Sequence, residues 1–238
     1  MAKIAEQVVV FDGSNSVDKC SATFQDVCVL PSGRILVSWR GGPQKGPINK
    51  GENGYYSISD DGGKTWGEEV TISEAGDIYP WDHRMGELEK GHLVDYIWTF
   101  DRRINDYLNI HMTESFDGGY TWSDLIDVGL PGQAGNPVQL PDGRVALPYF
   151  DRTGVPTLKL AFSYDGGKNF GEPMEVYRHE APKAEHAKNA YAEAWDEMGK
   201  YTAGHCFQDL DTDGNLLIVN YAGPQTHQTN TMLTKVLV

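Results

Sequence analysis

Residues 59–66 read SDDGGKTW, and this short stretch decides the fold because its pattern returns twice. Residues 115–122 read SFDGGYTW and residues 163–170 read SYDGGKNF, so each copy has the form Ser-x-Asp-x-Gly-x-Thr/Asn-aromatic. The aspartates at the third position are 56 and 48 positions apart (117 − 61 and 165 − 117). A recurrence at about 50 residues is typical of a repeat protein whose unit is one propeller blade.

Each copy of the motif predicts a tight turn. Glycine supplies the positive φ angle, and the aspartate carboxylate accepts hydrogen bonds from the backbone N–H groups that follow it. The closing Trp or Phe fastens the turn to the sheet by apolar burial. The motif therefore indicates how the chain folds and does not by itself indicate chemistry.

A second repeat lies between these turns and sets the register. The predicted hairpin turns are Pro31–Arg34, Glu89–His92, Pro141–Arg144 and Thr212–Asn215. The inner strands that precede them are Asp26–Leu30, Arg84–Leu88, Asn136–Leu140 and His205–Leu210. The second strands that follow are Ile35–Trp39, Leu93–Phe100, Val145–Phe150 and Leu216–Tyr221. A third strand leads into each motif, and Glu69–Ile72, Leu125–Val128 and Met174–Tyr177 come after it, so each unit is a four-stranded antiparallel meander.

The fourth unit breaks off before a motif of its own. Its third strand, Met232–Val238, has no fourth strand after it, and Gln7–Phe11 at the other end is a strand without a blade. We expect these two strands to pair and to close the ring, because closure hides both edges. An insert at about 179–200, rich in helix formers, predicts a short helix between blades.

The motif resembles the Asp box, or BNR repeat, of the sialidase-like β-propellers. The resemblance implies an all-β propeller of four-stranded blades and a carbohydrate-active protein, which we expect to be a glycoside hydrolase. Sialidases have six blades, whereas four to five can be counted in this chain. A complete small propeller, an incomplete propeller that associates with another copy, and a truncated chain all remain open.

Composition bounds the class of protein. With 238 residues, 39% of them hydrophobic, residues 1–238 are expected to form one domain. The net charge of −14 argues against nucleic acid or an anionic membrane as partner, and a glycan is the expected ligand. The start lacks a signal peptide, which predicts a cytoplasmic protein, or a secreted one if a signal was removed.

The expected ligand site is the face opposite the hairpin turns, where the starts of inner strands and the ends of second strands gather around the axis. The candidates for catalysis are Asp82, Asp101, Asp151 and His205, with Asp26 as a further carboxylate. The candidates for substrate binding are Arg40, Arg84, Arg102, Arg152, His83, Asn136, Trp81 and Tyr221. No cofactor or metal is expected, because the seven histidines lack the spacing of a metal site.

Two chemistries fit these residues. Paired carboxylates hydrolyse a glycosidic bond, one as acid and one as nucleophile or base. The resemblance instead implies an arginine triad that grips a substrate carboxylate, for which Arg40, Arg84 and Arg152 are available. The chain departs from the sialidase pattern, because Ala22–Gln25 stands where that family has Arg-Ile-Pro. Tyr191 with Glu193 is the candidate for the family's Tyr/Glu pair.

Two further interpretations stay open. A strand that leaves the core for water naturally ends with an aromatic and then a charged residue, which would explain Phe100-Asp101 and Phe150-Asp151 without a ligand. The same face could also bind a glycan or a protein without catalysis. The segment Asp211–Asn215 is predicted to be a hairpin turn and not a calcium loop, because it lacks the downstream Glu.

Overall fold

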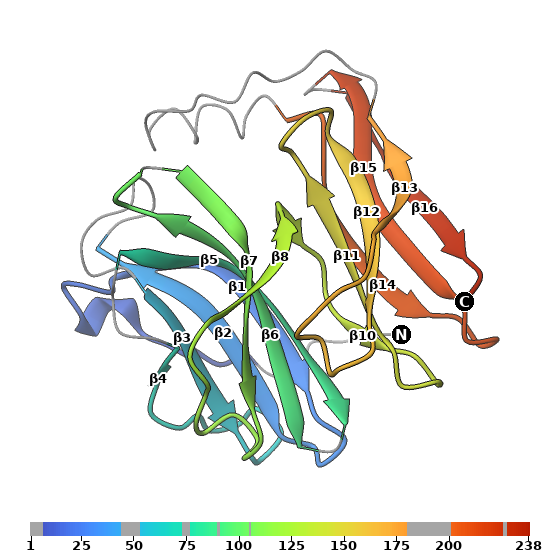
Figure 1. Cartoon of the computed structure of the whole chain (residues 1–238). Helices are drawn as coiled ribbons and strands as arrows, with labels where there is room; N and C mark the ends of the chain where they lie inside the picture. Colours follow the sequence, from blue (N-terminus) through green and yellow to red (C-terminus); the bar gives the residue numbers. More distant parts are fainter. Residues whose placement is uncertain are drawn as a thin grey trace.

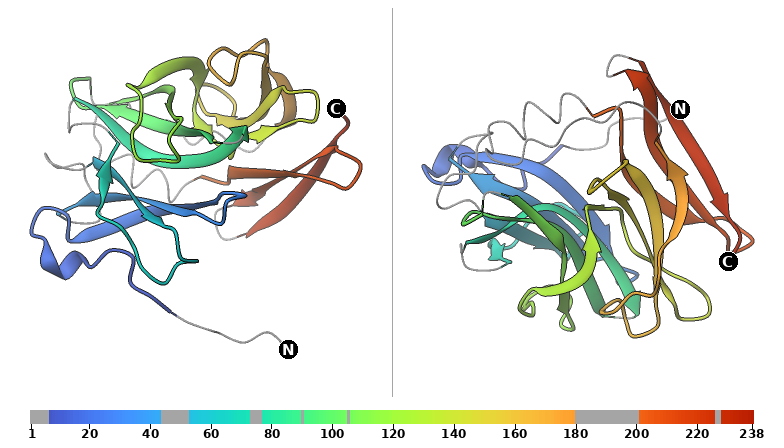
Figure 2. Two further views of the ribbon diagram at one scale, coloured as in Figure 1. Left: turned by 90° about the horizontal axis from the view of Figure 1, so that it is seen from below. Right: turned by 45° about the horizontal axis from the view of Figure 1, so that its top comes forward.

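The computed structural model describes residues 7–43, 53–72, 77–89, 91–104, 106–179, 201–225 and 228–238, with only the backbone of Tyr79 and Trp81. These residues form strands β1 to β16 and one short 3₁₀ turn, η1 (Gly13–Asn15). The strands make four antiparallel sheets that follow one another around a common axis (Figure 1, Figure 2). The protein is therefore an all-β propeller of four sheets, as the repeats predict.

Each sheet is a meander with its first strand toward the axis. Sheet 1 contains β1 (Ser21–Val29), β2 (Ile35–Gly42), β3 (Asn53–Ser59) and β4 (Val70–Thr71). Sheet 2 contains β5 (Ile78–Glu89), β6 (His92–Asp101), β7 (Asp106–Ser115) and β8 (Ile126–Pro131). Sheet 3 contains β9 (Gln133–Ala134) and β10 (Val138–Gln139), which both pair with β11 (Val145–Asp151), then β12 (Thr157–Ser163) and β13 (Met174–Arg178). Sheet 4 contains β14 (Ala203–Leu210), β15 (Leu216–Gln225) and β16 (Gln228–Val236).

The hairpins form as predicted. The N–H of Leu30 donates to the carbonyl of Arg34 at 2.8 Å, and the turn glycine Gly33 has φ +88°. The same bond joins Asp211 to Asn215 at 2.8 Å, which confirms that this segment is a turn. The carboxylate of Asp211 accepts the backbone N–H groups of Asp213 and Asn215 and pairs with Lys235. Positive φ at the turn is why glycine recurs there.

The three repeated turns (59–66, 115–122 and 163–170) share one hydrogen-bond pattern. In the second turn, Asp117 accepts from the hydroxyl groups of Ser115 and Thr121 and from the backbone N–H groups of Tyr120 and Thr121, at 2.6 to 3.0 Å. The indole N–H of Trp122 donates to the carbonyl of Gly119 at 3.1 Å. The carboxylate thus organises the turn and the aromatic ring holds it against the sheet.

The hydrophobic core lies between consecutive sheets. Tyr56 and Leu36 of sheet 1 pack with Ile97 of sheet 2, and Tyr96 of sheet 2 packs with Tyr149 of sheet 3. A third cluster places Phe150 and Leu158 of sheet 3 against Cys206 and Ile218 of sheet 4. Each sheet is thereby held by burial against its neighbour along the chain.

Two polar contacts recur at equivalent positions and fasten neighbouring sheets; we call them junction latches. Asp26 lies seven residues before its turn glycine (33 − 26), and its Oδ2 accepts the N–H of Met85 at 2.8 Å. Asn136 lies seven before its own turn glycine (143 − 136), and its Oδ1 accepts the N–H of Gln208 at 2.8 Å. Both partners stand six residues before the next turn glycine (91 − 85 and 214 − 208). A short polar side chain at the seventh position therefore fixes the next inner strand.

The predicted closure of the ring by the N-terminal strand is wrong in this structure. Residues 7–11 form no strand, and β16 is the third and last strand of sheet 4 among the described residues. Phe11 instead stacks on Trp39 of sheet 1, with ring centroids 5.2 Å apart. The N-terminal segment therefore contacts sheet 1 through an aromatic ring and does not pair with the last strand of sheet 4. The predicted helical insert at 179–200 lies outside the described residues except for His179.

The inner strands start earlier than predicted, since β1 begins at Ser21, β5 at Ile78 and β14 at Ala203. No helix in the described part of the chain is long and apolar enough to cross a membrane.

Candidate functional site

Irregularities in the inner strands aim side chains toward the axis. The register of β5 shifts between Pro80 and Asp82, and that of β14 shifts between Gly204 and Cys206. The extra residue in β14 is His205, which has φ +42°. A non-glycine residue in this region costs about 1–3 kcal/mol and persists only where the surroundings impose it. The bulge therefore lowers the stability of the fold but directs the imidazole of His205 toward the axis.

Residues of three sheets meet there, and we call Asp82, Arg84, Gln133, Arg152, His205 and Tyr221 the axial cluster. Arg84 donates two hydrogen bonds to the carboxylate of Asp82, at 2.7 and 3.0 Å. The amide nitrogen of Gln133 donates to Asp82 Oδ2 at 2.9 Å and lies 3.4 Å from His205 Nδ1. Asp82, Arg84 and Gln133 are buried, whereas His205 keeps part of its ring in solvent.

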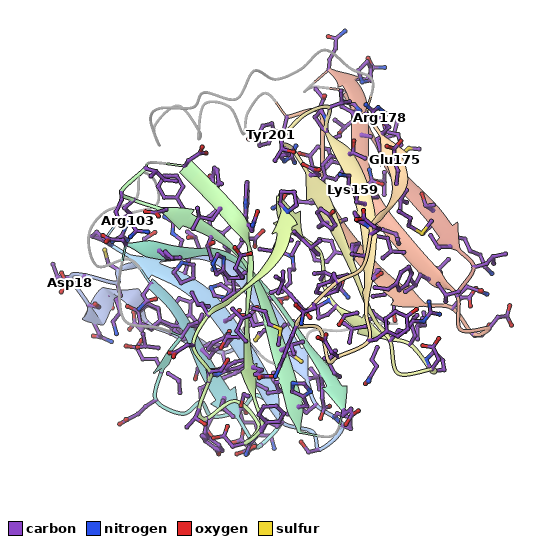
Figure 3. The ribbon with its side chains drawn as sticks, in the orientation of Figure 1. Asp18, Arg103, Lys159, Glu175, Arg178 and Tyr201 are labelled. Atoms are coloured by element: carbon purple, nitrogen blue, oxygen red, sulfur yellow. The ribbon has the colours of Figure 1, made fainter. Side chains whose placement is uncertain are left out.

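Arg152 forms the other half of the cluster. Its guanidinium lies 4.0 Å from the ring centroid of Tyr201 and 4.9 Å from that of Phe150, and it donates a hydrogen bond to Tyr221. Figure 3 shows Tyr201 at the upper end of the molecule. A Cβ at Gly204 would collide with the guanidinium and with the Tyr221 hydroxyl, so glycine is required for this close approach. The arginine is 5% exposed and is sandwiched between aromatic rings.

Charge and burial shape the ionisation of the cluster. Partial burial lowers the pKa of His205, and the positive charges of Arg84 and Arg152 act in the same direction, against the opposing effect of Asp82. Burial likewise lowers the pKa of Arg152. The cluster therefore favours a neutral imidazole beside two arginines at neutral pH.

Two features keep Arg84 from forming a junction latch: its guanidinium has no acceptor for an N–H, and the partner position is a proline. Arg84 also stands seven residues before its turn glycine (91 − 84), which is the latch position. The residue six before the next turn glycine is Pro137 (143 − 137), which has no N–H to donate. Gly86 packs directly against the Pro137 ring instead. The side chain of Arg84 donates instead to the carboxylate of Asp82.

Asp101 and Asp151 lie at the ends of their second strands, as predicted, but their carboxylates bind local groups. Asp101 accepts the backbone N–H of Arg103 at 2.8 Å and pairs with its guanidinium, which lowers the pKa of Asp101. Asp151 accepts the N–H and hydroxyl of Thr153 and pairs with Lys159 at 2.7 Å. Burial opposes ionisation of Asp151, yet these contacts leave its pKa lowered. Both carboxylates cap the turns that follow their strands.

Three other predicted binding residues lie apart from the cluster. Fully buried His83 lies on the face of sheet 2 that packs against sheet 1, near Tyr56, and its Nδ1 is 2.7 Å from Asp95 of β6 in its own sheet. Adjacent residues of a strand point to opposite faces, which separates His83 from its neighbours Asp82 and Arg84. Asn136 is a junction latch, and Arg40 is buried with its guanidinium 5.4 Å from the Phe24 ring centroid.

The remaining two predicted residues, Arg102 and Trp81, lie next to the end of β6 and within β5. Arg102 follows β6, where its backbone N–H donates to the carbonyl of Asp77 at 2.9 Å. Trp81 is in β5, but its side chain lies outside the described residues.

Sequence reasoning missed Gln133 and Tyr201. Gln133 was missed because Gly135 and Pro137 resemble a loop, so the inner strand of sheet 3 was predicted to start at Asn136. The spacing of the repeat could have identified Gln133. It stands ten residues before its turn glycine (143 − 133), as the predicted binding residue Trp81 does (91 − 81).

The structure also has hollows at the opposite end of the inner strands, among the hairpin turns. One is lined by Leu30, Arg34, Asp60, Glu87 and Gly118, together with neighbouring turn residues. Arg34 spans it, with bonds to Asp60 and to the carbonyl of Gly118, so its polar groups serve contacts between sheets. Within the described residues, no three His, Cys, Asp or Glu side chains gather as metal ligands.

Comparison with known proteins identifies the fold. No protein-family model matches the chain. A sialidase from Micromonospora viridifaciens is 30% identical over 130 residues, which are 51% of this chain and 20% of that protein. Among solved structures, the Hadza microbial sialidase Hz136 has a TM-score of 0.64 at 13% identity, covering 91% of this chain and 45% of its own. The NanB sialidase from Streptococcus pneumoniae also has a TM-score of 0.64 at 13% identity, covering 96% and 53%.

A glycosidase with another substrate shares the architecture. The xylan β-1,4-xylosidase from Bacillus halodurans C-125 has a TM-score of 0.57 at 13% identity, covering 92% of this chain and 42% of its own. The chain is thus a β-propeller with the fold of sialidase-like glycosidases. It spans a fifth of the curated relative and about half of each of these solved structures.

Proposed function

We propose that this chain is a carbohydrate-active propeller, a glycoside hydrolase of the sialidase-like type that takes a glycan at the axial cluster. The observation that carries the proposal is the convergence of Asp82, Gln133, Arg152 and His205 from three sheets on one point of the axis. The likeness to sialidases and a xylosidase supports the class of ligand, and the repeated turns are then Asp boxes. The sugar and its linkage are matters for experiment.

Asp82 is the proposed catalytic carboxylate, because it lies in the cluster and its oxygens accept from both Arg84 and Gln133. Glycoside hydrolysis ordinarily needs a second carboxylic acid whose pKa is raised. Asp26 is the candidate, because burial raises its pKa and its charge is coupled to that of Arg84. His205 and Arg152 would bind sugar oxygens, with the Tyr201 ring available for stacking.

A panel of fluorogenic glycosides that includes a sialoside tests this proposal. We expect turnover of at least one glycoside, and a fall of about 100-fold or more in kcat/KM for Asp82→Asn. Asp142→Asn is the matched control, because Asp142 is an exposed hairpin carboxylate that pairs with Arg144. Unchanged turnover in Asp82→Asn would show that the reaction occurs elsewhere.

A non-catalytic glycan-binding propeller is the second candidate. It is favoured by Asp101 and Asp151, whose carboxylates are engaged in turns, so that Asp82 is the one carboxylate among the described cluster residues. Calorimetric titration with the same sugars separates the two candidates. Binding without turnover, weakened by Arg152→Ala and retained in Asp82→Asn, would establish the binding module. Neither binding nor turnover on any glycan would contradict both.

A further inference from the structure

Gln133 presents one amide group to two neighbours in the axial cluster. Its Nε2 is 2.9 Å from Asp82 Oδ2 and 3.4 Å from His205 Nδ1, and an amide nitrogen carries two hydrogens. Asp82 is paired with Arg84, so its carboxylate can only accept. The amide must therefore turn its nitrogen, and not its oxygen, toward Asp82. The same nitrogen then faces His205 as a donor.

We infer that Gln133 is a positioning residue that holds His205 as the neutral tautomer with its proton on Nε2, so that this ring offers a ligand a hydrogen-bond donor and not a base. A neutral imidazole has one donor nitrogen and one acceptor nitrogen, and the partner of one nitrogen decides the role of the other. Because Nδ1 accepts from Gln133, the proton resides on Nε2. The term ligand rests on the proposed function, whereas the tautomer belongs to the free protein.

The groups around His205 agree with a neutral ring. Strand β5 contributes the ion pair of Asp82 and Arg84, and the segment after β11 contributes the cation Arg152. The carboxylate of Asp82 already accepts from Arg84 twice and from Gln133 once, so most of its hydrogen-bonding capacity is used. Tyr221 lies at a tilted ring contact, with centroids 6.0 Å apart. Among the described residues, no side chain is bonded to His205 Nε2.

The inference defines what the cluster presents to a bound molecule. His205 Nε2–H would join the guanidinium of Arg152 in donating toward the axis. A group of the ligand with oxygen acceptors fits such donors, whereas a group that must lose a proton to His205 does not. Proton transfer in the proposed reaction would then rest with carboxylates and not with this histidine.

The test is a long-range ¹H–¹⁵N NMR correlation of the imidazole in the full chain at pH 7, assigned by the signals lost in His205→Asn. The expected wild-type spectrum has one protonated nitrogen, Nε2, and one acceptor nitrogen, Nδ1. A ring protonated on Nδ1 alone, or on both nitrogens, would overturn the inference. This spectrum needs no ligand, so its result is independent of whether a glycan binds or is cleaved.

Two substitutions then identify Gln133 as the cause. Gln133→Leu removes the donor, and we expect the nitrogens of His205 to shift toward a mixture of tautomers. Gln133→Glu replaces the donor with an acceptor, which should move the proton to Nδ1 and raise the pKa of His205. Gln139→Leu is the control, since Gln139 bonds only to the carbonyl of Gly143. An unchanged tautomer in both Gln133 variants would overturn the positioning role. If neither variant folds, the wild-type spectrum still decides the tautomer.

Discussion

The junctions inside the propeller differ from the two outer faces of its first and last sheets. Between sheets 1 and 2, and again between sheets 3 and 4, a polar side chain at the seventh position latches the next strand. On the unjoined sides of the first and last sheets, the equivalent residues are Val27 of sheet 1 (33 − 27) and Phe207 of sheet 4 (214 − 207), whose ring centroid lies 5.0 Å from the guanidinium of Arg84. They are 59% and 43% exposed, and an apolar side chain cannot accept an N–H. A repeated sequence position thus becomes a joint only where its side chain is polar and its neighbour has an N–H.

The repeated turns also differ in whether their glycine contacts the preceding sheet. The second turn rests on the preceding sheet, where Gly119 meets Leu36, and the third does so through Gly167, whose carbonyl accepts the hydroxyl of Tyr96 at 3.0 Å. In the first turn, Gly63 meets only residues of its own sheet. The turns therefore fold alike, but in two of the three the fifth-position glycine also contacts the preceding sheet.

The largest expected effect comes from adding one methyl group at the third turn. In Gly167→Ala the positive φ of +90° is strained, and the new Cβ collides with the buried Tyr96 hydroxyl. We expect a loss of about 4 kcal/mol in the free energy of unfolding, from strain, overpacking and a broken hydrogen bond. Chemical denaturation measures it.

Gly63→Ala is the matched variant of the first turn, with nearly the same φ of +89° and its nearest neighbour 3.7 Å away. It should cost about 1 kcal/mol, from strain alone. Equal losses in the two variants would show that the contact with the preceding sheet carries no stability.

Removal of a junction latch should have the next largest effect. Asn136→Ala leaves the backbone N–H and C=O of Gln208 without the two bonds of 2.8 Å that Asn136 makes to them. Each unpaired buried group costs about 1–3 kcal/mol, so we expect a loss of about 3 kcal/mol in the free energy of unfolding.

Val27→Ala on the outer face of sheet 1 provides the comparison for the latch. Its side chain is 59% exposed, and the loss should stay near 0.5 kcal/mol, about the limit for surface substitutions. A similar loss in both variants, measured by the same denaturation, would remove the distinction between joined and outer faces.

The smallest effect concerns charge at the other latch, and it depends on pH. Burial raises the pKa of Asp26 above 3.8, so the folded state holds this proton more tightly than the unfolded state. The resulting stability is full below pH 3.8 and is lost as the pH rises through the folded pKa. Asp26→Asn keeps an oxygen for the Met85 N–H without the charge, as Asn136 does in sheet 3.

We therefore expect Asp26→Asn to be more stable than the wild type at pH 7, with the gain vanishing below about pH 4. Thermal melts at the two pH values measure the difference. A less stable variant at pH 7 would mean that the attraction between Asp26 and Arg84 outweighs the cost of burial.

Local sequence chemistry predicts most of the fold and only part of the site. The repeated turns and hairpins depend on neighbours within a few residues, so their glycines and aspartates could be read directly. The position of the N-terminal segment could not be predicted in this way. Phe11 stacks on Trp39 instead of the segment pairing as a strand, and no pattern among neighbouring residues indicates that contact. In the site, the structure brings Asp82, Arg84, Arg152, His205 and Tyr221 together, since they flank the inner and second strands, and their roles stay a prediction.

Other candidate residues lie apart from the axial cluster for identifiable reasons. His83 and Asp82 are adjacent in β5, so their side chains point to opposite faces of the sheet. The bulge at Trp81 shifts the register of β5 against β6 just before them. Asn136 was engaged by Gln208, a contact that spans 72 positions in the sequence. Such long-range partners depend on how two sheets pack and cannot be seen within one repeat.

Arg84 and Pro137 show how one unit of a repeat protein can differ in function from the others. The units share one scaffold position, which in the second unit holds Arg84, a side chain with no acceptor, while the partner position holds Pro137, which has no N–H. Arg84 binds Asp82 instead, and the two residues that set this unit apart are 53 positions from each other (137 − 84). In an engineered array of such units, an arginine at this position together with a proline at the partner position would be a way to convert one joint into a recognition point while the other joints keep their bonds.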